Sequence, residues 1–149
     1  MGRGYTSKCE ICGYEFSGNY GIGFLFPQQY EELVEKAKSG ELGNEIQSFF
    51  EENEDGAIDA EYVTLCCEDC GNLEIGYDLS MWLPKVKIKP VGYVMRIDLE
   101  DNYKKVMDYP HTCSKCSGKM KVIHQKGHKK LKCPKCKKIM KEDRMLLWD

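Results

Sequence analysis

Apolar residues recur at helical spacing in one part of the chain, between about residues 28 and 53. Pro27 suits the first turn of a helix. The residues that follow at intervals of three and four are Tyr30, Leu33, Val34 and Ala37. Gly40 offers a stop, and a second short helix is expected over residues 44–52. The pattern therefore predicts a helical hairpin over about residues 28–53, with an aromatic core of Phe24, Phe26, Phe49 and Phe50.

Elsewhere apolar and polar residues alternate over short runs, which is the period of a half-buried strand. Strands are expected at residues 62–65, 73–79, 93–99 and 119–124, with a last strand reaching Leu147 and Trp148. Residues 101–110 are expected to connect two parts of the chain. The mixture of one helical hairpin with short strands predicts an α+β fold.

Cysteine is the outstanding residue type, because eight of the nine cysteines fall into four Cys-x-x-Cys pairs. The pairs are Cys9/Cys12, Cys67/Cys70, Cys113/Cys116 and Cys133/Cys136. Disulfide frameworks belong to secreted chains, whereas such pairs in a cytosolic chain indicate metal binding. One pair alone would also fit a thioredoxin-like redox motif, but four pairs do not. Structural zinc sites are closed by four soft ligands, so eight cysteines predict two zinc ions.

Spacing suggests how the pairs combine. The last two pairs enclose 16 residues, close to the usual spacing of a four-cysteine zinc site. They predict a three-stranded zinc ribbon held by Cys113, Cys116, Cys133 and Cys136. The first two pairs enclose 54 residues, and are expected to close a second site with the helical hairpin as an excursion. Its ligands would be Cys9, Cys12, Cys67 and Cys70.

Cys66 is an alternative ligand to Cys67 in that second site. Cys67 is favoured because it keeps the Cys-x-x-Cys turn, and Cys66 is then expected to be a small buried apolar residue. A reactive thiol beside the metal is the other interpretation of Cys66. Gly13 and Gly71 each follow the second cysteine of a pair, where a positive φ is often needed.

The charge is divided unevenly along the chain, although the net charge is only −2. Residues 1–110 hold 10 Lys and Arg against 21 Asp and Glu, and residues 111–149 hold 12 against 3. Such a step predicts a domain boundary near Pro110, between an acidic metal-binding domain (1–110) and a basic zinc ribbon (111–149).

The basic ribbon predicts binding to the phosphates of DNA or RNA. Segment 111–141 contains no Phe, Tyr, Trp or Arg, so base stacking and bidentate guanine recognition are not expected, and sequence specificity should be weak. The expected contacts are Lys115, Lys119, Lys121, Lys129, Lys130, Lys132, Lys135, Lys137 and Lys138. Two alternatives remain open. The lysines serve solubility alone, or the protein is an adaptor whose acidic body contacts a protein partner or its own basic tail.

Residues 111–148, with the motifs Cys113-x-x-Cys116 and Cys133-x-x-Cys136, resemble zinc-ribbon domains. The run Cys9-x-x-Cys12-Gly13-Tyr14, followed by Phe24-Leu25-Phe26-Pro27, is also similar to small bacterial zinc-ribbon proteins of uncharacterised function. These resemblances imply a metal and a fold, and no particular activity.

The first two cysteine pairs, each followed by glycine, also resemble those of rubredoxins. That resemblance implies iron at Cys9, Cys12, Cys67 and Cys70, and electron transfer as an alternative function. The longer interval between the pairs departs from the rubredoxin pattern, and sulfur ligands alone do not separate zinc from iron.

No catalytic constellation is found, so a non-enzymatic protein is expected. The histidines at 111, 124 and 128 are expected to be exposed rather than ligands, since eight cysteines already close two sites. No apolar run approaches the about 18 residues that span a bilayer, and the amino terminus lacks an apolar signal-peptide core. The sequence therefore predicts a cytoplasmic protein without a membrane segment.

Overall fold

The chain forms two compact units that alternate along the sequence. The computed structural model describes residues 2–87, 92–124 and 129–148. Unit 1 comprises Met1–Gly23, Tyr62–Gly76 and Pro110–Asp149, and unit 2 comprises Phe24–Glu61 and Tyr77–Tyr109. This division differs from the expected single boundary near Pro110. Residues 111–149 do not form a separate ribbon, because their strands pair with strands from the two earlier segments of unit 1.

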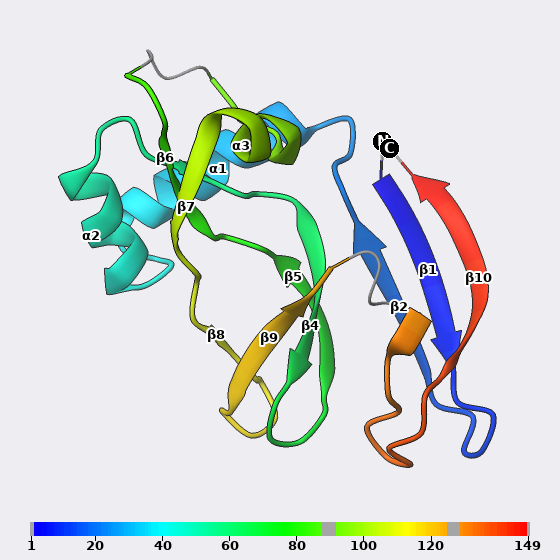
Figure 1. Cartoon of the computed structure of the whole chain (residues 1–149). Helices are drawn as coiled ribbons and strands as arrows, with labels where there is room; N and C mark the ends of the chain where they lie inside the picture. Colours follow the sequence, from blue (N-terminus) through cyan, green and yellow to red (C-terminus); the bar gives the residue numbers. More distant parts are fainter. Residues whose placement is uncertain (1, 88–91, 125–128, 149) are drawn as a thin grey trace. The chain divides into compact units, whose positions relative to one another are not determined.

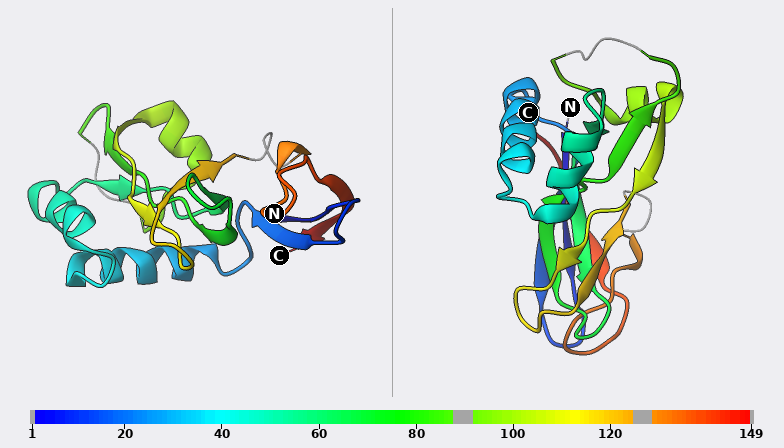
Figure 2. Two further views of the ribbon diagram at one scale, coloured as in Figure 1. Left: turned by 90° about the horizontal axis from the view of Figure 1, so that it is seen from below. Right: turned by 90° about the vertical axis from the view of Figure 1, so that its left-hand side faces the viewer.

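Unit 1 contains two sheets (Figure 1). The first has the order β10-β1-β2, with bounds Lys141–Trp148, Gly2–Lys8 and Glu15–Tyr20. The second has the order β5-β4-β9-β8, with bounds Leu73–Tyr77, Tyr62–Cys67, Lys119–Ile123 and His111–Thr112. The first and last strands of the chain run antiparallel, with Gly2 opposite Trp148 and Lys8 opposite Lys141. Figure 2 shows them side by side. The expected last strand therefore exists, but it joins β1.

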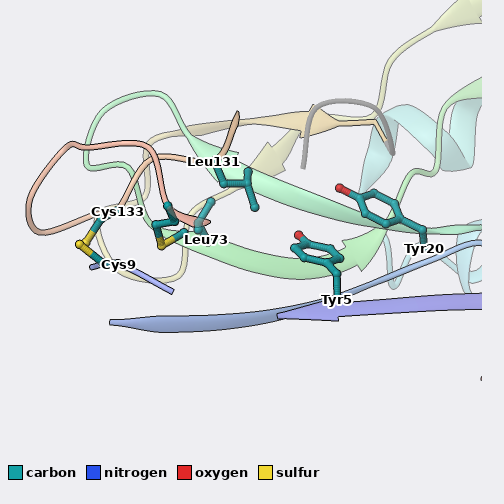
Figure 3. Close-up of a cluster of buried hydrophobic side chains, with 7 residues drawn as sticks. Tyr5, Cys9, Tyr20, Leu73, Leu131 and Cys133 are labelled. Atoms are coloured by element: carbon teal, nitrogen blue, oxygen red, sulfur yellow. The ribbon is translucent and has the colours of Figure 1, made fainter. Parts of the chain in front are cut away.

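A small apolar cluster draws on both sheets of unit 1 (Figure 3). Its buried members are Tyr5, Cys9, Tyr20, Leu73, Leu131, Cys133 and Met140. The rings of Tyr5 and Tyr20 stack with their centroids 5.2 Å apart, and the Tyr5 hydroxyl shares a hydrogen bond with Thr64 on β4. A second cluster contains Val63, Leu65, Cys67, Cys113 and Met120. Because both clusters include cysteines, the apolar core of unit 1 is continuous with its candidate metal ligands.

Unit 2 contains the helical hairpin that the sequence predicts. Helix α1 spans Phe26–Ser39 and α2 spans Asn44–Glu52. Gly40 ends α1 with φ 88°, and its N–H donates to the carbonyl of Ala37. Phe26, Phe49 and Phe50 are buried as expected, but Phe24 is wrong as a core residue, since it precedes the helix and is 85% exposed. No helix in the described ranges has the length and apolar character needed to cross a membrane.

The rest of unit 2 differs from the sequence expectation. A sheet of order β3-β6-β7 is formed by Ala57–Ile58, Met81–Pro84 and Tyr103–Met107. The expected strand at 93–99 is wrong, because Arg96–Asn102 forms helix α3. The Asp98 carboxylate accepts the N–H of Met95 and so caps the first turn. The expected connecting segment at 101–110 contains β7, which pairs with β6.

A buried ionic cluster joins α3 to the sheet side of unit 2. The Nε of Arg96 donates to Asp59 Oδ2 at 2.7 Å, and its other nitrogens lie 3.7 Å from Glu61 and Asp78. Asp59 is 3% exposed. Burial, together with the Asp78 carboxylate, raises the pKa of Asp59 to about 6 against the opposing effect of Arg96. One guanidinium therefore offsets part of the repulsion among three carboxylates.

Replacing Arg96→Met should lower the free energy of unfolding of unit 2 by about 3 kcal/mol, because buried carboxylates then lose their counter-charge. The chain has two tryptophans, of which Trp82 lies in unit 2. Its fluorescence during urea unfolding, in a Trp148→Phe background, reports this unit alone. The control Lys105→Met removes an exposed ion pair with Asp108 and should cost less than about 1 kcal/mol. Equal losses for the two variants would contradict a structural role for the buried cluster.

Candidate metal centres

The four Cys-x-x-Cys pairs adopt one backbone conformation, which we call a knuckle. In each knuckle the N–H of the first cysteine donates to the carbonyl five residues later, and its carbonyl accepts the N–H four residues later. Knuckles 1 to 4 are residues 9–14, 67–72, 113–118 and 133–138. The first cysteine of every knuckle is buried. The turn thus presents two sulfurs on one side while satisfying its own backbone groups.

The knuckle requires a left-handed residue directly after its second cysteine. Gly13 and Gly71 have φ of 78° and 77° in knuckles 1 and 2, as the sequence predicts. Ser117 and Lys137 occupy the same position in knuckles 3 and 4, with φ of 62° and 61°. The left-handed region costs a non-glycine residue about 1–2 kcal/mol. Sequence reasoning missed these two positions, because only their place after the second cysteine distinguishes them.

The knuckles combine in a nested order. The outer site contains Cys9, Cys12, Cys133 and Cys136 from knuckles 1 and 4. The inner site contains Cys67, Cys70, Cys113 and Cys116 from knuckles 2 and 3. Within each site the four sulfurs lie within 4.8 Å of one another. All eight predicted cysteines are therefore brought into two groups suited to metal ions, and both groups lie in unit 1.

This pairing corrects the sequence-based combination, which joined knuckle 1 to knuckle 2 and knuckle 3 to knuckle 4. The reason lies in the strands. Cys9 directly follows β1, and β10, which pairs with β1, begins soon after knuckle 4. In the inner site Cys67 lies opposite Met120 of β9, just after knuckle 3. Long-range strand pairing, rather than short spacing, brings the knuckles together. The rubredoxin-like set of Cys9, Cys12, Cys67 and Cys70 is consequently not assembled.

Sulfur separations fit a tetrahedral ion. A Zn–S distance of about 2.3 Å implies sulfurs about 3.8 Å apart in a tetrahedron. The Sγ atoms of Cys12 and Cys133 are 3.6 Å apart in the outer site. In the inner site Cys67 and Cys116 are separated by 3.4 Å, and Cys70 and Cys113 by 3.7 Å. All nine cysteines are free thiols, so the donor set is the one that zinc or another soft cation takes.

Backbone amides favour thiolates in both sites. The N–H of Cys12 and then that of Ile11 lower the pKa of Cys9 to about 7. Burial acts to raise the pKa of Cys113, but the hydrogen bonds from the N–H groups of Cys116 and Lys115 outweigh it and lower the pKa to about 7. Hydrogen bonding to Cys12, followed by burial, raises the pKa of Cys136 to about 12. Four crowded sulfurs thus share protons among themselves, and a divalent cation replaces these protons when it binds.

Two residues that sequence reasoning missed brace the inner site. The Asn72 side-chain amide donates to Cys113 Sγ at 3.6 Å and to Glu74 Oε2 at 2.9 Å. The same carboxylate oxygen accepts the N–H of Ser114 at 3.0 Å. Knuckles 2 and 3 are therefore linked by hydrogen bonds beyond their sulfurs, an arrangement that orients metal ligands. No sequence signal marks Asn72 or Glu74, because both act across the sheet.

Cys66 lies outside both groups, so Cys67 is the cysteine that the structure places among the sulfurs. The Cys66 side chain is half-buried and packs against the apolar cluster of unit 1. Burial raises the pKa of its thiol, which suits the apolar interpretation of this residue. His111 is half-buried and His124 exposed, and neither belongs to a group of metal-ligating side chains in the described chain. His128 lies outside the described residues.

All nine lysines expected to contact phosphates are exposed. Lys115, Lys119 and Lys121 lie in knuckle 3 and on β9, and the remaining six lie within or before knuckle 4. In the described part of the chain none of the nine forms an ion pair with a carboxylate. Unit 1 as a whole holds 14 Lys and Arg against 8 Asp and Glu, whereas unit 2 holds 8 against 16.

Comparison of the chain with protein-family models, with curated proteins and with solved structures finds no match. The assignment of the two candidate metal centres therefore depends on the geometry of the cysteines in this structure.

The nested pairing predicts how zinc content changes when whole knuckles lose their sulfurs. Cys→Ser replacement in knuckles 1 and 4 removes the outer site only, so one zinc per chain should remain. The same replacement in knuckles 1 and 2 takes two ligands from each site, so no zinc should remain. Elemental analysis of protein purified without added metal measures both variants beside the wild-type chain, which should hold two zinc ions. The reverse result, none in the first variant and one in the second, would restore the pairing derived from spacing.

The left-handed residues of the knuckles predict opposite effects on stability. Ser117→Gly should raise the free energy of unfolding of the zinc-loaded protein by about 1 kcal/mol, since glycine adopts this φ without strain. Gly13→Ala should lower it by about 1 kcal/mol. A Cβ at Gly13 meets no atom within 4 Å, so the loss would be conformational only. Urea unfolding followed by circular dichroism measures both, and a destabilising Ser117→Gly would show that the serine side chain is needed.

Proposed function

We propose that the protein is a non-enzymatic zinc-binding protein whose unit 1 binds the phosphates of DNA or RNA with little sequence specificity. The two groups of four cysteines support the metal-binding part, and closed four-sulfur sites leave no open position for catalysis. The nucleic-acid part is supported by the lysines. We call the nine exposed lysines of knuckles 3 and 4, β9 and the adjoining segment 129–132 the basic face.

The basic face gains its main support from the positions of Lys121 and Lys137. Lys121 lies opposite Cys66 of β4 in the strand register, and the Lys137 Nζ donates to the carbonyl of Cys70 in the knuckle that follows β4. Lys121 belongs to β9, which leads away from the inner site, and Lys137 belongs to knuckle 4 of the outer site. Both groups of lysines therefore adjoin β4 and the knuckle after it, so a phosphate backbone that follows this part of unit 1 can contact both.

Contacts of Lys137 fix the junction between these groups. Its Nζ donates to the carbonyl of Cys70 at 3.2 Å, and a Cβ at Gly71 would lie 3.1 Å from the same Nζ. Knuckle 4 of the outer site thus lies against knuckle 2 of the inner site. Folding of both metal centres then shapes a single positive surface, which is why metal binding and phosphate binding belong to one proposal.

Electrostatic contact without base recognition is the expected mode. Lysine is a point charge on a flexible stem and suits phosphate oxygens, whereas arginine reads guanine in a bidentate manner. Segment 111–141 has neither arginine nor an aromatic residue. Each lysine that neutralises a phosphate releases a counterion, so affinity should fall steeply with salt.

Fluorescence anisotropy with two unrelated DNA duplexes and one RNA tests the proposal. Lys119→Gln with Lys121→Gln should weaken binding to all three probes and reduce the slope of log affinity against log salt by about 2. The matched control Lys104→Gln with Lys105→Gln removes the same charge from β7 in unit 2 and should leave the slope unchanged. Equal effects of the two variants, or no salt-dependent binding by the zinc-loaded protein, would reject the basic face as the contact surface.

A further inference from the structure

Unit 2 contains two adjoining hollows that the metal centres do not use. The first has a volume of about 290 Å³ and lies among α1, the turn after α2 and residues 92–94. The second has a volume of about 490 Å³ and lies between residues 92–95 and α3. Gly92, Val94 and Tyr103 line both, so we treat them as one groove with an acidic end and an apolar end.

The acidic end has an apolar floor below a charged rim. Buried Tyr30, Phe50 and Tyr103 form part of the floor. The rim carries four carboxylates against the single ammonium of Lys38: Glu31, Glu35, Glu54 and Asp55. The Lys38 Nζ lies 5.7 Å from the centroid of the Phe50 ring, which is within the range of a cation–π contact. The chain itself thus places a cation against the aromatic floor.

The apolar end adjoins it through Tyr103 and is lined in part by Val86, Tyr93 and Met95. Val86 is 69% exposed and Tyr93 is 42% exposed, so this end offers apolar surface that nothing in the described chain covers. Pockets that orient a ligand combine such apolar walls with a few polar groups. A ligand that fits the whole groove therefore needs an apolar group beside a cationic one.

Tyr103 joins the acidic end of the groove to its apolar end. The residue as a whole is 5% exposed, and it lines both hollows. Burial raises the pKa of Tyr103, and the carboxylates of Asp98 and Asp55 raise it further. Asp98 lines the apolar hollow and Asp55 lines the acidic one. Tyr103 therefore lies where the two hollows meet, and its hydroxyl can donate a hydrogen bond to a ligand there.

We propose that this groove binds a basic peptide segment of a partner protein, with an apolar side chain at the apolar end and a Lys or Arg side chain on the acidic rim. Charge complementarity supports this occupant, since unit 2 carries a balance of −8, and a net negative charge attracts cations. A peptide presents both an apolar anchor and a cation within a few residues. Its backbone also supplies carbonyl oxygens that accept a hydrogen bond from Tyr103.

The test uses the full zinc-loaded chain and three labelled synthetic peptides. The first contains arginine, leucine and glycine, the second has serine in place of leucine, and the third has glutamate in place of arginine. Fluorescence anisotropy should give binding of the first peptide only, because each end of the groove contributes. Equal binding of the first and second peptides would overturn the proposal, since attraction would then depend on charge alone. Absence of binding by the first would overturn it as well.

Matched variants locate the contact. Glu35→Gln with Glu54→Gln changes two rim carboxylates and should weaken the first peptide about tenfold. Glu41→Gln with Glu51→Gln removes the same charge from exposed positions outside the groove and should change affinity less than about twofold. Tyr103→Phe keeps the ring and should weaken the peptide by removing the hydroxyl alone. Equal losses in the two double variants would place the peptide elsewhere on unit 2. Nucleic-acid binding should stay unchanged in all of them.

Discussion

Unit 1 is organised around two groups of four cysteine sulfurs, each of which could hold one cation. Its principal apolar cluster has only seven buried residues, and two of them are cysteines of the outer site. So small a core offsets little of the entropy of folding, whereas a structural zinc ion contributes about 10–16 kcal/mol in zinc-finger peptides. The long loops of the nested order add little cost. Closing the loop of 120 residues between Cys12 and Cys133, instead of the loop of 16 residues between Cys116 and Cys133, costs about 2 kcal/mol more in chain entropy. Strand pairing can therefore decide which knuckles meet.

Unit 2 is stabilised by an apolar core without cysteines, and it consists of two insertions between segments of unit 1. Residues 24–61 leave unit 1 after β2 and return at β4, and residues 77–109 leave after β5 and return at β8. Within unit 2, fully buried Phe26, Ile46 and Leu99 form an ordinary core. The inner site holds the strands from which both insertions return, since its knuckles follow β4 and β8. A metal ion at the inner site would therefore fix the ends of both insertions, while the core of unit 2 has its own contacts.

Local features of this fold could be predicted from the sequence, and long-range ones could not. Helix α2 has the expected bounds, since its spacing and its flanking glycine and asparagine act within a few residues. The eight cysteines were identifiable because the knuckle is itself local. The nested pairing was not, because β1 and β10 lie at opposite ends of the chain. Helix α3 was missed because the contacts that favour it, from Arg96 to Asp59 and Asp78, cross most of unit 2. The positive φ of Ser117 and Lys137 could not be predicted, since neither residue type favours the left-handed region.

The uneven distribution of charge along the chain does not correspond to a simple boundary between an acidic and a basic domain. The step near Pro110 reflects composition along the chain, whereas the two units carry balances of +6 and −8. Each site of four thiolates with one divalent ion would contribute a charge of about −2. The two sites together would lower the net charge of unit 1 to about +2. Its net charge is then too small to attract a polyanion by itself. The proposed phosphate binding would depend on lysines that lie within a Debye length, about 10 Å, of the same phosphates. The positions of Lys121, opposite Cys66 on β4, and of Lys137, at the Cys70 carbonyl, therefore support the proposal more than the total number of lysines does.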